Sequence, residues 1–192
     1  MARERKFSKD ELFQTTKDIL LSHGYEGFTF SILADRLQVS RGTIYKYYEN
    51  KVELITDYTL FEMNQFLTDL KQLDHNGNFD AQFEYLLTIM FTHSKIRHIL
   101  ITANRILGTE NEKVKAKKEQ LGELHWEIYR HLESFIGRGR EENVLKSHIP
   151  DELILSFIFH SIEIPNQLSL TQEEWVQSVK ELLSHGMLKE NY

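Results

Sequence analysis

The sequence has no cysteine, and only two prolines and nine glycines among its 192 residues. Without cysteine, the chain can form no disulfide, no thiolate zinc site and no cysteine nucleophile. Tight turns rely on proline and glycine, so their scarcity argues against a fold built from many short strands. A chain without disulfides also fits a reducing compartment.

Long apolar runs are missing as well. The best of them, residues 153–162, is about half as long as a membrane-spanning helix and contains His160. The first residues, MARERKFSKDELFQ, carry basic side chains but no apolar segment behind them, unlike a secretory signal peptide. We therefore expect a cytoplasmic protein with no membrane partner.

Charge is unevenly distributed along the chain, whose formal net charge is −6. Residues 1–51 hold nine lysines and arginines against seven acidic residues, whereas residues 52–192 hold 14 against 22. Any affinity for a polyanion is therefore expected to lie in the first quarter of the chain. The basic run KVKAKK, residues 113–118, is interpreted as a solvated helix face, with a second polyanion site as the alternative.

Apolar residues recur at helical spacing along most of the chain, which predicts an all-α fold. The first helix is expected to begin at Ser8 or Asp10 and to end at Gly24, where a glycine can adopt a positive φ. The later helices are predicted over residues 32–37, 41–48, 51–73, 81–93, 95–107, 110–136, 151–164 and 171–188.

Polar residues that favour helix starts precede the second, third and fourth of these helices. Ser31 is expected to open the second, Ser40 to cap the third and Asn50 to cap the fourth. Three short helices followed by a long one, joined by turns of a few residues, are typical of a helix-turn-helix domain.

The spacing of small and apolar residues supports this domain. Three of these residues, Ala34, Val39 and Ile44, follow one another at intervals of five. The small Ala34 side chain lets the two helices cross closely, and the larger Val39 and Ile44 side chains fill the corner between them. The outward face of the third helix then carries arginine, glycine, threonine, lysine and tyrosines. Tyr48 lies on the Ile44 side and is interpreted as a core residue.

This outward face suits DNA. Arg41 can form two hydrogen bonds with a guanine edge, and Gly42 lets the backbone approach the duplex. Hydroxyls and helix N-terminal amides attract phosphates, and Lys51 is well placed for another phosphate. The alternative is that the tyrosines belong to the core and the cations to a solvated face. The candidate DNA-binding residues are Thr29, Ser31, Ser40, Arg41, Gly42, Thr43, Tyr45, Lys46, Tyr47 and Lys51.

The segment FTFSILADRLQVSRGTIYKYYENKVELI, residues 28–55, resembles the DNA-binding domain of the TetR family of bacterial transcriptional regulators. It departs from the family pattern at Gln38, where the family often has glycine, so either a strained backbone or a slightly different turn is expected there. Tyr48 replaces the usual phenylalanine. The resemblance implies a helix-turn-helix domain over residues 1–52 and a helical ligand-binding and dimerisation domain over residues 53–192.

The resemblance also implies function. It implies a homodimeric repressor whose two recognition helices enter successive major grooves of a palindromic, double-stranded operator. The long fourth helix would link this domain to the ligand-binding domain. No cofactor is expected, and sequence alone does not separate repression from activation.

The last two predicted helices are candidates for the dimer interface. The segment DELILSFIFHSIEI is apolar nearly all round, so one of its faces needs a second partner. The alternative is that both helices are core of a monomer. The candidate interface residues are Leu153, Phe157, Ile158, Trp175, Val179, Leu182 and Leu183.

An effector site is expected in the middle helices. Aromatic residues with a few polar groups would accept a small apolar or aromatic molecule, although for any single residue ordinary core is the better interpretation. The candidate pocket residues are Tyr58, Phe61, Phe83, Phe91, His93, His98, Trp126, Tyr129 and Phe157.

Other functions have weaker support. The chain has no catalytic serine motif, no glycine-rich phosphate loop and no cysteine, so an enzyme is not expected. Its nine histidines leave metal sensing open, but none are spaced as ligands on one helix face. A constitutive DNA-binding protein without any effector is a further alternative.

Overall fold

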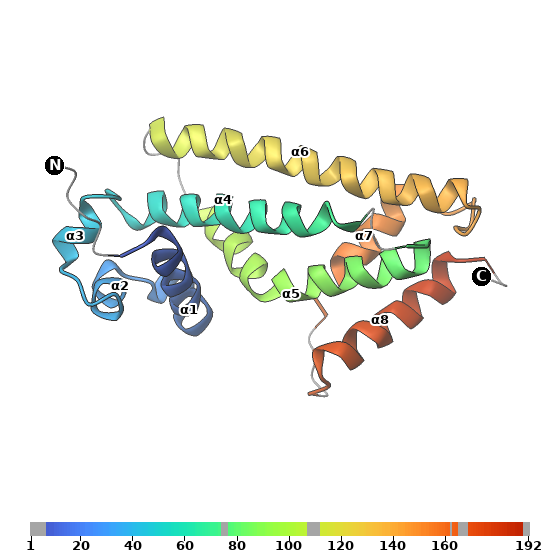
Figure 1. Ribbon diagram of the computed structural model, residues 1–192, viewed down its shortest axis with the longest axis horizontal. Helices are drawn as coiled ribbons and strands as arrows, with labels where there is room; N and C mark the ends of the chain where they lie inside the picture. The colour runs from blue at the N-terminus through green and yellow to red at the C-terminus, as the bar shows by residue number, and fades with distance from the viewer. Residues whose placement is uncertain (1–6, 74–76, 107–111, 162, 165–168, 190–192) are drawn as a thin grey trace. The chain divides into compact units, whose positions relative to one another are not determined.

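A computed structural model describes residues 7–73, 77–106, 112–161, 163–164 and 169–189, except for the side chains of 95, 97–99 and 101–106 (Figure 1). Over these residues the fold is all-α, as predicted, and an isolated bridge between Leu145 and Leu188 is the sole β-type pairing. No helix within the described ranges has both the length and the apolar composition to cross a membrane.

The described residues form eight helices. Their bounds are α1 Lys9–Gly27, α2 Phe30–Arg36, α3 Arg41–Tyr45, α4 Lys51–Leu70, α5 Phe79–Ile106, α6 Glu112–Glu141, α7 Asp151–Ser161 and α8 Gln172–Met187. The break predicted between residues 93 and 95 is wrong, because α5 continues through it. The Ser94 hydroxyl donates to the Phe91 carbonyl 2.8 Å away within the same helix, so this serine caps no new one.

The start of α1 confirms one of the two predicted caps. The Ser8 hydroxyl accepts a hydrogen bond from the Glu11 amide at 3.0 Å, and the Ser8 amide donates to the Glu11 carboxylate at 2.6 Å. Gly24 has φ +66° and ψ −178°, so the expected change to positive φ occurs there. The last turn of α1, up to Gly27, follows this kink and was not predicted.

The caps of α2 and α4 were predicted with mixed success. Thr29, not Ser31, caps α2, because its hydroxyl accepts from the Ile32 amide at 3.3 Å, and Ser31 lies inside the helix. Asn50 caps α4 as predicted, with its side-chain oxygen accepting from the Glu53 amide at 3.0 Å.

The chain divides into two compact units. One comprises Met1–Met63 and Lys95–Gly122, and the other comprises Asn64–Ser94 and Glu123–Tyr192. The functional boundary expected at residue 52 therefore does not coincide with a boundary between units. Leu54, Ile55 and Tyr58 of α4 are fully buried in the core of the N-terminal unit, which explains why this unit extends beyond residue 52.

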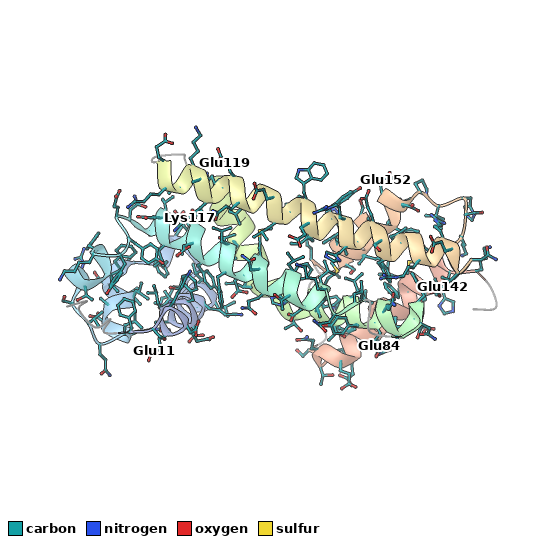
Figure 2. The ribbon with its side chains drawn as sticks, turned by 45° about the horizontal axis from the view of Figure 1, so that its top comes forward. Glu11, Glu84, Lys117, Glu119, Glu142 and Glu152 are labelled. Carbon is teal, nitrogen blue, oxygen red and sulfur yellow. The ribbon has the colours of Figure 1, made fainter. Side chains whose placement is uncertain are left out.

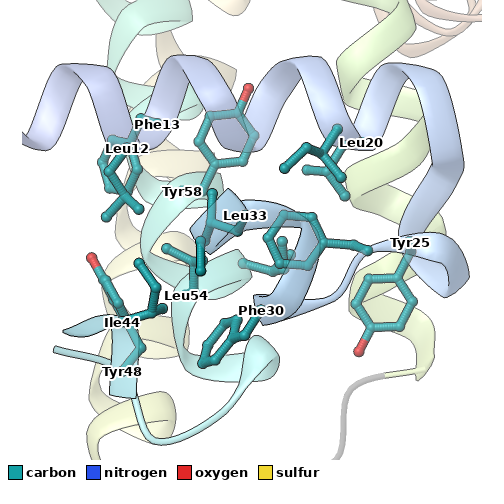
Figure 3. Close-up of a cluster of buried hydrophobic side chains, with 14 of the residues drawn as sticks. Leu12, Phe13, Leu20, Tyr25, Phe30, Leu33, Ile44, Tyr48, Leu54 and Tyr58 are labelled. Atoms are coloured by element: carbon teal, nitrogen blue, oxygen red, sulfur yellow. The ribbon is translucent and has the colours of Figure 1, made fainter. Parts of the chain in front are cut away.

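That core joins α1 to α4 (Figure 3). The Phe13 ring meets the Tyr58 ring edge-on at 5.6 Å and the Phe61 ring at 5.0 Å. The Tyr58 hydroxyl donates to Glu62, whose carboxylate also lies 3.3 Å from the Lys17 ammonium. Burial and the neighbouring Glu62 carboxylate raise the pKa of Tyr58, so the phenol remains a neutral donor.

In the C-terminal unit, aromatic rings and ion pairs connect the helices. Phe79 and Phe83 of α5 stack on Phe135 of α6, with centroids 4.6 and 6.4 Å from the Phe135 ring. Lys180 of α8 lies 2.8 Å from Asp80 and 2.9 Å from a second α5 carboxylate, Glu84, which Figure 2 labels. These contacts fix α5, α6 and α8 within the unit.

Gly139 is the point of closest packing in this unit. A Cβ built there would lie 2.5 Å from the Phe79 ring and 2.8 Å from Leu145, whereas a Cβ at Gly137 would meet nothing within 4 Å. We expect Gly139→Ala to lower the free energy of unfolding by about 1–3 kcal/mol through overpacking. Gly137→Ala, the matched control in the same helix, should raise it by about 0.5–1 kcal/mol. Urea unfolding measures both, and equal effects would contradict the close packing at Gly139.

Candidate nucleic-acid interface

The turn between α2 and α3 has the predicted helix-turn-helix packing. Ala34 and Ile44 are buried and Val39 is partly buried, and the Val39 amide donates to the Ala34 carbonyl at 3.0 Å. Gln38 has φ +53°, so the strain expected at this non-glycine position is confirmed. A left-handed conformation costs a residue with a Cβ roughly 1–2 kcal/mol, which the surrounding packing must offset.

The outward face of α3 is open to solvent. Arg41, Gly42 and Lys46 are exposed, and a Cβ at Gly42 would meet nothing nearer than the Ser40 hydroxyl, 3.9 Å away. Tyr45 is 49% exposed, and its ring rests edge-on against Phe30 at 5.1 Å. A cation, a phenol and bare backbone therefore share one accessible helix face.

The start of α3 differs from its prediction in detail. Ser40 precedes the helix with an extended backbone but makes no side-chain cap. Its hydroxyl instead lies 2.9 Å from the Thr43 hydroxyl. Helix α3 ends at Tyr45, three residues before the predicted end at Tyr48, and the chain turns through residues 46–47.

The two tyrosines after α3 have different environments. Tyr48 is buried, as predicted, and its hydroxyl donates to Asp57 at 2.6 Å. Tyr47 is half-buried, with its ring edge-on to Phe7 at 5.5 Å. The two other candidates, Thr29 and Ser31, lie at the start of α2, where the Thr29 hydroxyl is already used as the helix cap.

Lys51 has an internal partner that sequence reasoning missed. Its ammonium donates to the Tyr25 carbonyl at 3.3 Å and lies 4.3 Å above the centre of the Tyr25 ring. An ammonium has three N–H donors, so this contact leaves others for a phosphate. The Tyr25 carbonyl lies in the last turn of α1, where it also accepts from the Phe28 amide at 3.3 Å, and no local pattern in the sequence marks it as a partner of Lys51.

The predicted pocket residues are divided between the two units. Tyr58 and Phe61 belong to the core of the N-terminal unit. Phe83, Phe91 and His93 lie in the C-terminal unit, where the His93 ring nitrogen Nε2 is 3.0 Å from the Asp69 carboxylate.

Two of the pocket predictions must be corrected. The Trp126 and Phe157 side chains are 69% and 60% exposed, so they lie on the surface rather than around an internal pocket. Tyr129 is half-buried, with its ring edge-on to Trp126 at 6.1 Å. The side chain of His98 falls outside the described residues.

The predicted dimer residues divide between surface and core. Leu153, Phe157 and Leu182 are exposed, at 46%, 60% and 76%. Ile158 and Val179 are buried and so belong to the core of their own unit. Trp175 and Leu183 are half-buried.

In the described part of the chain, no three histidine, aspartate or glutamate residues are placed to hold a metal ion together. The polar side chains of α3 itself, Arg41, Thr43 and Tyr45, are a cation and two hydroxyls. These are groups that bind anions and base edges.

Residues 12–58 match the family model described as "Bacterial regulatory proteins, tetR family". No curated protein matches the sequence. Among solved structures, the ketosteroid transcriptional regulator KstR2 of Mycobacterium tuberculosis is similar, with a TM-score of 0.71 and 14% identity over 99% of this chain and 98% of that one.

Two further solved structures are also similar. The regulator FadR of Bacillus subtilis, solved in complex with stearoyl-CoA, has a TM-score of 0.67 and 18% identity over 93% of this chain and 99% of its own. The TetR-family regulator PfmR of Thermus thermophilus has a TM-score of 0.71 and 13% identity over 91% of this chain and 97% of its own. Residues 12–58 therefore form a helix-turn-helix segment of the tetR-family type, and the chain shares the fold of these solved regulators along nearly its full length.

Proposed function

We propose that the chain is a repressor that binds a palindromic operator as a homodimer and is released by a small apolar effector. The observation that carries the DNA-binding part is the open outward face of α3, with Arg41, Gly42 and Tyr45 together on it. Arg41 would read a guanine edge, while Tyr45, Tyr47 and the remaining donors would bind phosphate or sugar.

The exposed apolar residues of α7 and α8 support the homodimer. Leu153 and Phe157 are four residues apart on α7, so they lie on one stripe of the helix. The neighbouring stripe, with Ile154 and Ile158, is buried in the same unit. Helices α7 and α8 contact each other, so a second copy would cover both and form a four-helix interface.

The interior of the C-terminal unit supports an apolar effector. Phe83 and Phe91 are buried there, and His93 with Asp69 supplies polar groups that would orient a ligand. The FadR structure contains stearoyl-CoA, whose acyl chain is apolar, and KstR2 is named a ketosteroid regulator, so the names of both neighbours include a molecule with a large apolar part. Stearoyl-CoA is therefore the first effector to test.

Release would follow from a shift in population. The effector would bind more tightly to a dimer conformation in which the recognition helices are wrongly spaced for the operator. If its binding free energy favours that conformation by about 1.4 kcal/mol, operator binding weakens tenfold.

Selection from a random pool of duplexes tests the proposal. We expect the protein to enrich a palindrome with half-sites about one helical turn apart or somewhat more, and to bind it as two chains per duplex. Adding stearoyl-CoA should weaken that binding. Enrichment of no sequence, or binding of one chain without symmetry, would contradict the dimeric operator. Unchanged affinity with stearoyl-CoA would contradict this effector but not the DNA site.

A further inference from the structure

Three carboxylates lie directly behind the proposed DNA-binding face. Glu49, Glu53 and Asp57, here called the carboxylate cluster, occupy the last residues before α4 and its first two turns. Glu49 is two residues from both Tyr47 and Lys51, which places their Cα atoms at most about 7 Å apart. Glu53 and Asp57 follow Lys51 along α4 by about 3 and 9 Å.

Such negative charges oppose DNA binding unless they are compensated. The Debye length at physiological salt is about 8–10 Å, so charges at these separations act on phosphates bound by Tyr47 and Lys51. Lys9 of α1, 3.8 Å from Asp57, compensates one of them. Two negative charges then remain in the cluster.

Two lysines of α6 supply the rest of the compensation. Lys113 and Lys117, here called the lysine pair, are one turn apart at the start of α6, and Figure 2 labels the second. Lys113 lies 3.3 Å from Glu49 and 3.7 Å from Glu53. Lys117 lies 3.2 Å from Asp57, with its ammonium 5.6 Å from the centre of the Tyr48 ring.

The start of α6 is held in place, and the Lys113 side chain is charged. Val114, beside Lys113, is fully buried, so the start of α6 packs on the N-terminal unit. The hydrogen bond with Glu49 and the nearby Glu53 charge raise the pKa of Lys113, which keeps the ammonium protonated.

Helix α6 is one continuous element, yet its residues belong to both units. Its start, up to Gly122, is part of the N-terminal unit, and its remainder is part of the C-terminal unit. A displacement of α6 that begins in the C-terminal unit would therefore reach the lysine pair along a single helix.

We propose that the lysine pair masks the carboxylate cluster when the operator is bound, and that withdrawal of the start of α6 uncovers these charges and repels the DNA backbone. The proposal rests on the proposed function, since it assigns the regulation of that DNA-binding face. The run KVKAKK is thus neither a plain solvated face nor a second polyanion site. Its ion-paired lysines act on DNA through the carboxylates.

Charge-neutral variants test the masking. Lys113→Gln/Lys117→Gln should weaken binding to the selected operator roughly tenfold at about 0.1 M salt, because two charges per chain lose their compensation near the phosphates. Adding Glu49→Gln and Asp57→Asn to this variant removes two negative charges as well. The fourfold variant should return to within about twofold of the unaltered protein.

The matched control is Lys115→Gln. Lys115 is exposed on the same turn of α6 and pairs with no described carboxylate, so its loss should weaken binding much less than Lys113→Gln alone. Circular dichroism verifies that each variant keeps its helices.

Three outcomes would overturn the inference. A fourfold variant as weak as the lysine variant would mean that the lysines contact DNA themselves or only hold α6 in place. Equal losses of operator affinity for Lys113→Gln and Lys115→Gln would mean that the loss comes from the change in net charge and not from the ion pairs of Lys113. Failure of the unaltered protein to bind any duplex would overturn the proposed function and the inference with it, whereas the first two outcomes leave the proposed function standing.

Discussion

Phe157→Glu is expected to yield a monomer that keeps its helices but binds the operator at least about 100-fold more weakly, because two linked half-site contacts become independent. The side chain is 60% exposed within one chain, so a carboxylate there remains hydrated when the chain is alone. In a dimer the same carboxylate would be buried without a partner, at a cost of several kcal/mol. Sedimentation gives the mass, and titration of the operator gives the affinity.

Trp126→Glu is the matched control for this prediction. Trp126 is even more exposed, at 69%, and also lies in the C-terminal unit, but it belongs to α6 rather than to α7 or α8. This variant should remain dimeric and retain operator binding. A Phe157→Glu protein that still sediments as a dimer would place the interface elsewhere.

Gly42→Leu is expected to abolish operator binding while leaving the fold intact. A Cβ at Gly42 meets only the Ser40 hydroxyl at 3.9 Å, so the free protein has room for the side chain. Replacing a glycine within a helix should even add about 0.5–1 kcal/mol of stability. Against DNA the leucine would occupy the space that the backbone needs, and a steric cost of about 1–3 kcal/mol at each half-site gives about 2–6 kcal/mol per dimer.

The control is the same substitution at Gly122, which is exposed on α6 and also has open space around it. Gly122→Leu should leave operator binding unchanged, and thermal unfolding should find both variants at least as stable as the original. If Gly42→Leu bound the operator normally, the backbone of α3 would not approach the duplex, and the proposed orientation of this helix would be wrong.

The N-terminal helices were the more predictable part, because local chemistry determines their ends. Ser8, Asn50 and Gln38 each fulfil their expected backbone role through contacts with residues a few positions away. Thr29, rather than Ser31, caps α2. Either hydroxyl residue suits an N-cap, and the residue at which the helix begins depends on the packing of Phe30 and Leu33 in the core.

The C-terminal helices were less predictable, because an all-apolar helix does not reveal which of its faces is covered. Phe157 and Ile158 are neighbours of similar character, yet one is 60% exposed and the other fully buried. Long-range partners are equally invisible in sequence. Nothing near Lys113 indicates that its ammonium meets Glu49, 64 residues earlier in the chain.

The buried group formed by Tyr58, Glu62 and Lys17 has a mechanical consequence. Lys17 of α1 pairs with Glu62 of α4, to which Tyr58 of the same helix also donates, so separating α1 from α4 would take this ammonium away from a buried carboxylate. Helix α4 therefore cannot tilt on its own, since α1 must travel with it. A signal that moves α4 would therefore move α1 together with it. Such a signal could change the position of these helices without changing their internal fold.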